Sequence, residues 1–135
     1  MSLKKILIAD DEPNIRLLVQ TTLEDADRQM IEACNGNEVL ELARKHVPDL
    51  IILDWLMPGL HGIDVAARLR SERKTAHIPI IMLTCKSQPA DMQQGREAGV
   101  STYLVKPFSP MELLERVQEA LSSSMDNNLL NQPST

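Results

Sequence analysis

The sequence predicts an α/β protein: a doubly wound, five-stranded parallel sheet with helices on both faces. Short apolar runs alternate five times with longer amphipathic stretches along the 135 residues. Three of the five runs are continuous in apolar residues, which is typical of strands buried on both faces. Parallel strands need crossover connections, and these are right-handed. The predicted strands are residues 6–9, 30–33, 50–53, 80–83 and 102–105.

Apolar residues at helical spacing lie between and after the predicted strands. Ile15, Val19 and Leu23 form such a stripe in the first helix. Ser109 before Pro110 is typical of the start of the fifth helix. The fourth helix is polar with few apolar anchors, so we expect it to be the element most easily displaced. The second to fifth helices are predicted at residues 37–46, 62–73, 89–98 and 110–121.

The composition fits one globular domain of ordinary size, which we place at residues 1–121. A net charge of -5 argues against direct nucleic-acid binding, because phosphate contacts need a basic face. No apolar run is long enough to span a membrane, and acids at residues 10–12 interrupt any signal-peptide pattern. Together with only two cysteines, this predicts a cytoplasmic protein. Polar residues dominate 122–135, which we expect to be a flexible tail or the start of a linker.

Polar side chains follow four of the five predicted strands. Asp10 and Asp11 follow the first strand, Asp54 the third, Thr84 the fourth and Lys106 the fifth. Ligands of open α/β sheets bind outside the carboxyl ends of the strands, where the strand order reverses. If the order is 2-1-3-4-5, the first and third strands are neighbours at that point, and the three aspartates face one another.

Clustered carboxylates repel one another and need a neutralising partner. A divalent cation with oxygen ligands supplies one, and Mg²⁺ suits the site because it keeps several waters and needs few carboxylates. Lys106 adds a further positive charge, and Thr84 adds a hydroxyl donor. An acceptor carboxylate, a metal, a hydroxyl and an ammonium together suit the binding and transfer of a phosphoryl group.

The order of these motifs resembles the receiver domains of bacterial response regulators, including the single-domain chemotaxis regulators. The resemblance covers about residues 4–121 and implies a flavodoxin-like fold with strand order 2-1-3-4-5. Each motif is weak alone, but their succession after predicted strands is specific. The matching residues are Asp10, Asp11, the Asp54-containing run Leu53, Asp54, Trp55, Leu56, Met57, Pro58, Gly59, Leu60, His61 and Gly62, then Thr84, and finally Lys106, Pro107 and Phe108.

The resemblance implies that Asp54 is the phosphoacceptor and forms an aspartyl phosphate. Asp11 would bind Mg²⁺ directly, together with Asp54 and the backbone carbonyl of Leu56. Asp10 would bind the metal through a water molecule, and Mn²⁺ would substitute for Mg²⁺.

Three further positions take their expected roles from the same resemblance. Thr84 would hydrogen-bond one phosphoryl oxygen, and Lys106 would pair with another. Tyr103 matches an aromatic switch position and would turn inward as Thr84 moves toward the phosphoryl group. The Lys106–Pro107 peptide bond is expected to be cis, which would direct the Lys106 side chain into the site.

In such proteins the phosphoryl group comes from a phosphohistidine of a sensor histidine kinase or a histidine phosphotransfer protein. We expect the donor to dock near the first helix and the loops around Asp54. Phosphorylation would then change the surface of the fourth helix, fifth strand and fifth helix, which would control an output partner or domain and support homodimerisation. The protein would catalyse only its own phosphorylation and dephosphorylation, and would not be an enzyme for other substrates.

Some positions differ from the commonest pattern of this family. His61 replaces an acidic or small polar residue, and Cys85 replaces Ala or Gly beside Thr84. Leu56 and Lys86 occupy the two variable positions that tune the lifetime of the phosphorylated state. An apolar Leu56 would hinder an attacking water.

Three other functions remain as alternatives. A haloacid dehalogenase-like phosphotransferase would place a second Asp two residues after the nucleophile, where this chain has Leu56. A flavodoxin-like cofactor module would need a Gly-rich turn after the first strand, where this chain has acids. A receiver that is never phosphorylated would not need the complete set of site residues. Acids at residues 10–12 could merely cap the first helix, but capping does not explain Asp54, Thr84 and Lys106.

Overall fold

Five parallel strands form one sheet in the order β2-β1-β3-β4-β5, which confirms the predicted fold. The computed structural model describes residues 3–25, 27–85 and 88–130, and side chains up to Ser122. The strands are β1 (Lys4–Ala9), β2 (Arg28–Ala33), β3 (Leu50–Asp54), β4 (Ile80–Thr84) and β5 (Thr102–Val105). The helices are α1 (Pro13–Leu23), α2 (Gly36–His46), α3 (Gly62–Ser71), α4 (Pro89–Ala98) and α5 (Pro110–Leu130).

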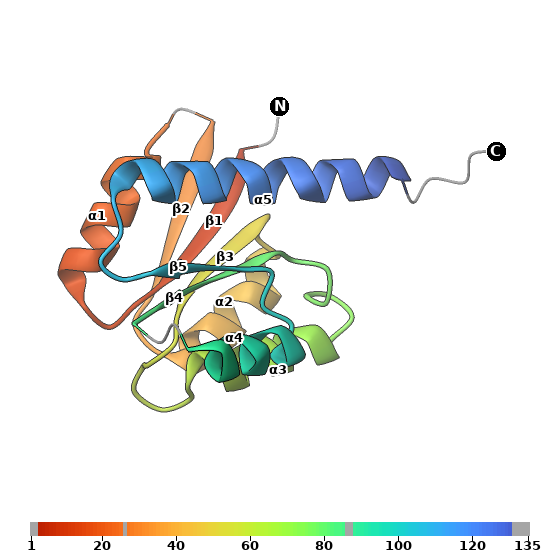
Figure 1. Cartoon of the computed structure of the whole chain (residues 1–135). Coiled ribbons are helices and arrows are strands. Elements are labelled where there is room, and N and C mark those ends of the chain that lie inside the picture. The colour runs from red at the N-terminus through yellow and green to blue at the C-terminus, as the bar shows by residue number, and fades with distance from the viewer. Residues whose placement is uncertain (1–2, 26, 86–87, 131–135) are drawn as a thin grey trace.

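Helices cover both faces of the sheet, as Figure 1 shows. α1 and α5 lie on one face, and α2, α3 and α4 lie on the other. Every residue of β3 and β4 is buried, which explains why these two strands read as continuous apolar runs. The alternation of side chains along each strand then divides the core into two clusters, one under each helical layer.

The register of the parallel pairs brings the functional positions to one edge of the sheet. Ala9 is opposite Leu53 in the β1–β3 pair, so Asp10, which follows β1, lies beside Asp54, the last residue of β3. In the β4–β5 pair, Thr84 is opposite Val105. Lys106, the residue after Val105, therefore lies at the same edge as Thr84. Strand pairing alone therefore assembles the residues that the sequence analysis selected.

The third helix is shorter than predicted, because it ends at Ser71 and not at residue 73. Glu72 adopts an extended conformation (φ -106°, ψ 134°). The hydroxyl of Thr75, a buried residue, donates a 2.6 Å hydrogen bond to the carbonyl of Leu69, and so satisfies one of the acceptors left at the helix end. The second helix starts one position earlier than predicted because Asn35 accepts a 2.9 Å hydrogen bond from the amide of Glu38.

The predicted boundary of the fifth helix near residue 121 was too early, since α5 continues to Leu130. Residues 122–130 are therefore helical. That a tail or linker begins at Ser122 stays a prediction. The chain has neither Gly nor Pro from Met111 to Leu130, and Ser, Asn and Asp each cost a helix less than about 1 kcal/mol. Residues 131–135 of the predicted tail lie outside the described residues. Among the described helices, none combines the length and apolarity that a membrane crossing requires.

Candidate phosphoryl-acceptor site

Three aspartates meet at the carboxyl edge of the sheet, as the sequence analysis expected. Asp10, Asp11 and Asp54 each offer a carboxylate oxygen within 4.8 Å of the others. Asp10 is fully buried and Asp54 is 6% exposed, whereas Asp11 is exposed. A buried cluster of like charges needs cationic partners, and the structure supplies one from the protein itself.

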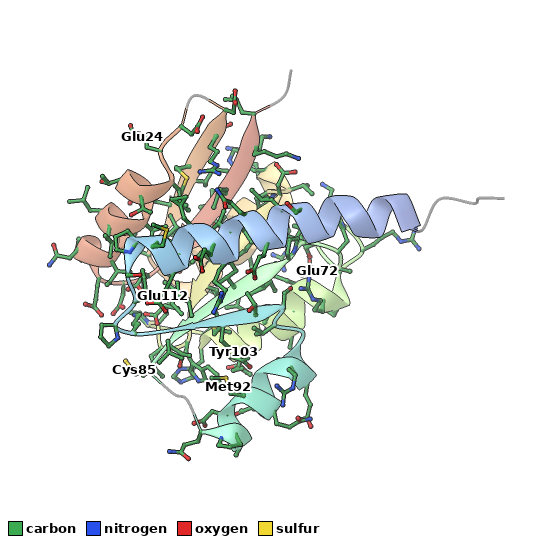
Figure 2. The ribbon with its side chains drawn as sticks, turned by 45° about the horizontal axis from the view of Figure 1, so that its top comes forward. Glu24, Glu72, Cys85, Met92, Tyr103 and Glu112 are labelled. Atoms are coloured by element: carbon green, nitrogen blue, oxygen red, sulfur yellow. The ribbon has the colours of Figure 1, made fainter. Side chains whose placement is uncertain are left out.

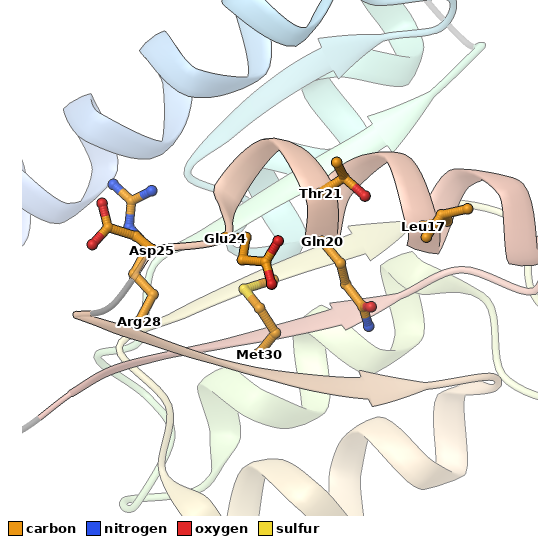
Figure 3. A pocket seen from close by; sticks show the side chains of 7 residues that line it. All are labelled: Leu17, Gln20, Thr21, Glu24, Asp25, Arg28 and Met30. Carbon is orange, nitrogen blue, oxygen red and sulfur yellow. The ribbon is translucent and has the colours of Figure 1, made fainter.

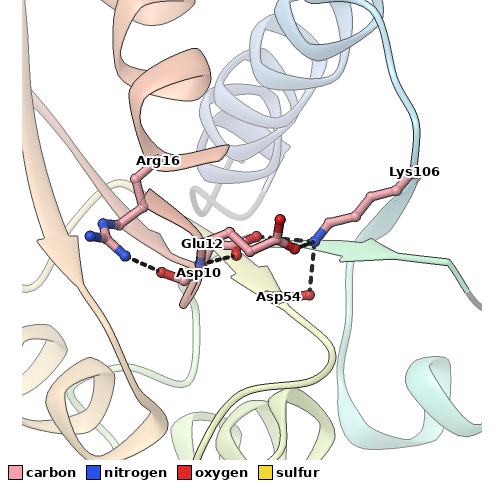
Figure 4. Close-up of polar contacts among 5 residues, drawn as sticks. All are labelled: Asp10, Glu12, Arg16, Asp54 and Lys106. Atoms are coloured by element: carbon pink, nitrogen blue, oxygen red, sulfur yellow. Dashed lines mark hydrogen bonds and ion pairs between the residues drawn. The ribbon is translucent and has the colours of Figure 1, made fainter. Parts of the chain in front are cut away.

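Lys106 is that partner, and it joins two strand ends (Figure 4). Its Nζ atom donates to Asp10 Oδ2 at 3.1 Å and to Asp54 Oδ1 at 3.3 Å. Glu12 lies farther away, with Oε1 4.0 Å from the ammonium. The Lys106–Pro107 peptide bond is cis in the structure. The acidic cluster is thus neutralised in part by a lysine that also lies within reach of an incoming anion.

Burial and charge shift the pKa values of this pair. Burial, followed by the nearby charge of Asp10, raises the pKa of Asp54 to about 6, although Lys106 and the amide of Leu56 act in the opposite direction. Burial acts to lower the pKa of Lys106, but the carboxylates of Asp54 and Asp10 outweigh it, so that this pKa is raised overall. Asp54 is therefore ionised near neutral pH while Lys106 remains charged.

A cavity of about 280 Å³ opens above Asp54. Thr84 is 1% exposed and contributes to its wall, and Leu56 is 56% exposed at the same cavity. Cys85 is exposed beside them. His61 is exposed just before α3, and Lys86 lies outside the described residues. The cavity is lined by Asp11, Glu12, Asp54, Trp55, Leu56, Thr84, Cys85 and Lys106.

Comparisons with known proteins agree with this geometry. The family model described as response regulator receiver domain matches residues 6–118. This chain belongs to the response regulator receiver family. The resemblance stated from the sequence is therefore confirmed.

Several relatives and solved structures are similar to this receiver domain. It is 44% identical to the phosphate regulon transcriptional regulatory protein PhoB of Pseudomonas aeruginosa, over 87% of this chain and 52% of the relative. It is 42% identical to the transcriptional regulatory protein ResD of Bacillus subtilis, over 94% of this chain and 52% of the relative. Chemotaxis response regulator CheY4 of Vibrio cholerae has a TM-score of 0.84 and 37% identity, covering 89% of this chain and all (100%) of that one. The chain thus spans about half the length of these two curated relatives.

Receiver domains of two-component response regulators are phosphorylated on Asp and bind Mg²⁺ at an acidic pocket. The donor set of this receiver fits such an ion, because its three clustered ligand groups are all carboxylates, the oxygen ligands that hard divalent cations prefer.

Tyr103 connects β5 of this receiver domain to α4 (Figure 2). Its hydroxyl donates to the backbone carbonyl of Met92 at 2.8 Å, and its ring packs against the core cluster beneath α2 and α3. A β-carbon at Gly95 would overlap the Tyr103 hydroxyl. The sequence analysis named Tyr103, and counted Met92 among the few apolar anchors of the fourth helix, but did not link either to the other or to Gly95. The signal for a close approach was a glycine inside a predicted helix.

The sequence analysis also missed Arg16 and Glu32. Glu32 lies in β2, the one strand whose end carried no signal, and Arg16 lies on α1. The two side chains form an ion pair of 3.0 Å close to the acidic cluster. Neither segment carries a sequence signal that these two side chains meet, so the pair could not be found from the sequence.

A second hollow, of about 460 Å³, lies between α1 and the edge strand β2 (Figure 3). It contains none of the predicted site residues. Its lining is formed by Leu17, Gln20, Thr21, Glu24, Asp25, Arg28 and Met30. This hollow is therefore separate from the cavity above Asp54.

Proposed function

We propose that this receiver accepts a phosphoryl group on Asp54 from a phosphohistidine, in a reaction that depends on Mg²⁺. The observation that supports this most directly is that Asp11, Asp54, Thr84 and Lys106 line one open cavity, while the buried Asp10 joins the carboxylate cluster behind it. Asp54 lies in that cavity with a carboxylate that is ionised near neutral pH.

Asp11 and Asp54 would hold the metal together with the backbone carbonyl of Leu56, and Asp10 would act through a water molecule. Mn²⁺ would substitute. When bound, the ion neutralises negative charge on the carboxylates and on the phosphoryl oxygens. Lys106 then serves a second purpose, because its ammonium can exchange an aspartate oxygen for a phosphoryl oxygen.

In the proposed transfer, a carboxylate oxygen of Asp54 attacks the phosphorus atom. The oxygen–phosphorus bond forms as the bond between phosphorus and the imidazole nitrogen breaks. The electron pair remains on that nitrogen, which takes a proton from solvent. Thr84 and Lys106 each pair with a phosphoryl oxygen. Leu56, exposed at the cavity, hinders water and so lengthens the life of the aspartyl phosphate.

We further propose that phosphorylation alters the surface formed by α4, β5 and α5. Gly95 is the single buried residue among those described in α4, so this helix is weakly anchored. Tyr103 links it to β5 and is the proposed switch with Thr84. Val105 and Met111 are 38% and 68% exposed on the neighbouring elements, which supplies apolar area for a partner or a second copy in a homodimer.

The proposed partners are a sensor histidine kinase or a histidine phosphotransfer protein, and an output partner or domain. PhoB and ResD are named as transcriptional regulators, so we infer an output in transcription. The net charge of -5 argues against nucleic-acid contact by the receiver itself, so in this proposal the output partner or domain makes that contact. Both cysteines carry free thiols, in keeping with a cytoplasmic location.

We propose no turnover of other substrates, only self-phosphorylation and self-dephosphorylation. A phosphotransferase of the haloacid dehalogenase type would need an acid two residues after the nucleophile, and Leu56 stands there. Hydrolysis of small phosphate esters with many turnovers per protein would contradict this part of the proposal.

The test is phosphorylation of the purified chain by a small-molecule phosphoramidate or a phosphohistidine protein, followed by intact-mass measurement. We expect one phosphoryl group per chain, dependent on Mg²⁺ and absent from Asp54→Asn. A modification that persists in Asp54→Asn would show that another residue is the acceptor.

A further inference from the structure

We propose that Arg16 is a positioning residue for the metal site, because its guanidinium bridges Glu32 of β2 to the backbone carbonyl of Asp10. By holding this carbonyl it fixes the peptide that joins Asp10 to Asp11, two of the three carboxylates of the cluster. The inference rests on the proposed function, since it concerns binding of the metal that the proposed reaction needs.

Arg16 makes two short contacts, one with the residue that follows β1 and one with β2. Its Nη1 donates to the carbonyl oxygen of Asp10 at 2.7 Å (Figure 4). Its Nε donates to Glu32 Oε1 at 3.0 Å. The side chain is 16% exposed, whereas that of Glu32 is 50% exposed. The planar guanidinium group of arginine has N–H donors in fixed directions, so it can hold two acceptors in one orientation, which the ammonium of a lysine cannot do.

The carbonyl contact completes the immobilisation of Asp10. Oδ1 of Asp10 accepts a 2.9 Å hydrogen bond from the amide of Glu12, and Oδ2 accepts one from Lys106 at 3.1 Å. The amide of Arg16 donates to the Glu12 carbonyl at 3.2 Å. Both the amide and the carbonyl of Glu12, in the turn from β1 into α1, are therefore hydrogen-bonded. The peptide plane after Asp10 sets the direction in which Asp11 leaves the strand, and Arg16 is the side chain that holds this plane.

Arg16 differs from Lys106 in its relation to the carboxylates. Lys106 bonds directly to carboxylate oxygens and so competes with a metal for them. Arg16 bonds to the backbone carbonyl of Asp10 and to Glu32, and neither acceptor is one of the three clustered carboxylates. Removing Arg16 therefore leaves the ligand atoms present but no longer oriented, and outer partners of this kind typically contribute 10- to 100-fold to metal affinity.

Charge and position predict opposite results for the same substitution. If Arg16 acted only as a nearby positive charge, its removal would strengthen Mg²⁺ binding. If Arg16 merely tied α1 to β2, its removal would lower the melting temperature of the metal-free protein and leave Mg²⁺ affinity unchanged. A positioning role predicts weaker Mg²⁺ binding in protein that remains folded.

The experiment measures the Mg²⁺ dissociation constant through the fluorescence of Trp55, which lines the same cavity as Asp54. We expect Arg16→Met to raise the dissociation constant about tenfold or more. The matched control is Arg44→Met, which breaks another Arg–Glu pair, with contacts of 2.6 and 2.8 Å to Glu72, away from the site. This control should leave the dissociation constant at the wild-type value.

Arg16→Lys keeps the positive charge and removes the guanidinium group. It is the variant to measure if Arg16→Met does not unfold cooperatively and so is not properly folded. We expect Arg16→Lys to raise the dissociation constant at least threefold, in line with the loss of an outer partner. An unchanged or lower value in the folded variants would overturn the role of Arg16 while leaving the metal site intact. Absence of any Mg²⁺ response in the wild-type protein would instead overturn the metal site, and with it this inference.

Discussion

The hydroxyl of Tyr103 on β5 donates a 2.8 Å hydrogen bond to the carbonyl of Met92 on α4. The contact is possible because Gly95, one turn further along α4, has no side chain to occupy the space of the ring hydroxyl. Gly95 is also the one buried residue among those described in this helix. A weakly anchored helix thus contacts β5 through an aromatic side chain and the glycine that admits it.

This arrangement predicts that Gly95→Ala destabilises the protein although alanine is the better helix former. Alanine in place of glycine favours a helix by about 1 kcal/mol, but the added methyl group would overlap the Tyr103 hydroxyl. We expect the free energy of unfolding, measured in urea, to fall. The measurement should include Tyr103→Phe, which keeps the ring and loses only the hydrogen bond, at a cost of about 1 kcal/mol.

The decisive control combines the two positions. In a Tyr103→Ala background the overlap is gone, so Gly95→Ala should stabilise the protein by up to about 1 kcal/mol. A change of sign between the two backgrounds identifies the contact as the cause. Stabilisation by Gly95→Ala in the wild-type background would contradict the prediction.

The strand ends show how far the sequence could predict the site. Asp54 and Thr84 follow runs that are buried along their whole length, so their place at the sheet edge could be predicted from local pattern and topology together. Lys106 could be placed by the same reasoning, but its contacts with Asp10 and Asp54, at 3.1 and 3.3 Å, required the structure.

The parts that could not be predicted depend on contacts between distant elements. Arg16 and Glu32 are polar residues on two amphipathic elements, and nothing in either segment shows that they meet. Gly95 inside a predicted helix indicates close approach without naming Tyr103 as the neighbour. The end of α5 was missed because Ser and Asn are common beyond helices and yet tolerated within them.

The raised pKa of Asp54 predicts that Asp54→Asn stabilises the protein in a pH-dependent way. The folded-state pKa is about 6, against an ordinary value of 3.8. The folded state therefore holds the proton of Asp54 more tightly than the unfolded state does. This proton binding contributes its full free energy of stabilisation below about pH 4, and the contribution is lost as the pH rises through 6. A difference of about two pKa units corresponds to at most about 3 kcal/mol.

Asparagine does not titrate, so its advantage over aspartate should appear only at the higher pH. Thermal melts without metal should show a higher melting temperature for Asp54→Asn at pH 8, and little difference at pH 4. An equal difference at both pH values would mean that ionisation of Asp54 is not the cause.

Lys106 should compete with a metal for the carboxylates. Its Nζ is bonded to both Asp10 and Asp54, so Lys106→Met removes a cation from the ligand atoms. We expect the Mg²⁺ dissociation constant at pH 8, where Asp54 is ionised, to fall several-fold. Lys74→Met is the control, because Lys74 contacts the carbonyl of Arg44 away from the site. Weaker Mg²⁺ binding in Lys106→Met would show instead that the lysine orients the carboxylates.

The start of α5 should depend on a reciprocal pair of hydrogen bonds. The amide of Glu112 donates to Ser109 Oγ at 3.1 Å, and the amide of Ser109 donates to Glu112 Oε1 at 3.2 Å. Ser109→Ala should lower the free energy of unfolding by about 1 kcal/mol. Ser109→Asp, which retains an acceptor at this position, should recover most of the loss. Equal losses in both variants would exclude capping as the reason.

Gly62 should be required for the position of Asp54. A β-carbon at Gly62 would overlap the carbonyl oxygen of Asp54 and lie 3.0 Å from Cα of Trp55, and neither backbone atom can move without displacing the end of β3. The amide of Gly62 also donates to the Trp55 carbonyl at 2.8 Å, which holds the two segments together.

Gly62→Ala is therefore expected to lower the free energy of unfolding by about 1 to 3 kcal/mol, the usual cost of overpacking, and to weaken Mg²⁺ binding because Asp54 shifts. Gly59→Ala is the matched control, in the loop that leads into α3. Gly59 has a φ of 81°, and the nearest atom to an added β-carbon is 3.8 Å away. Backbone strain at Gly59 costs about 1 kcal/mol without displacing Asp54, so stability should fall while the Mg²⁺ dissociation constant stays at the wild-type value. If both alanine variants bound Mg²⁺ like the wild type, close packing at Gly62 would not be what positions the acceptor.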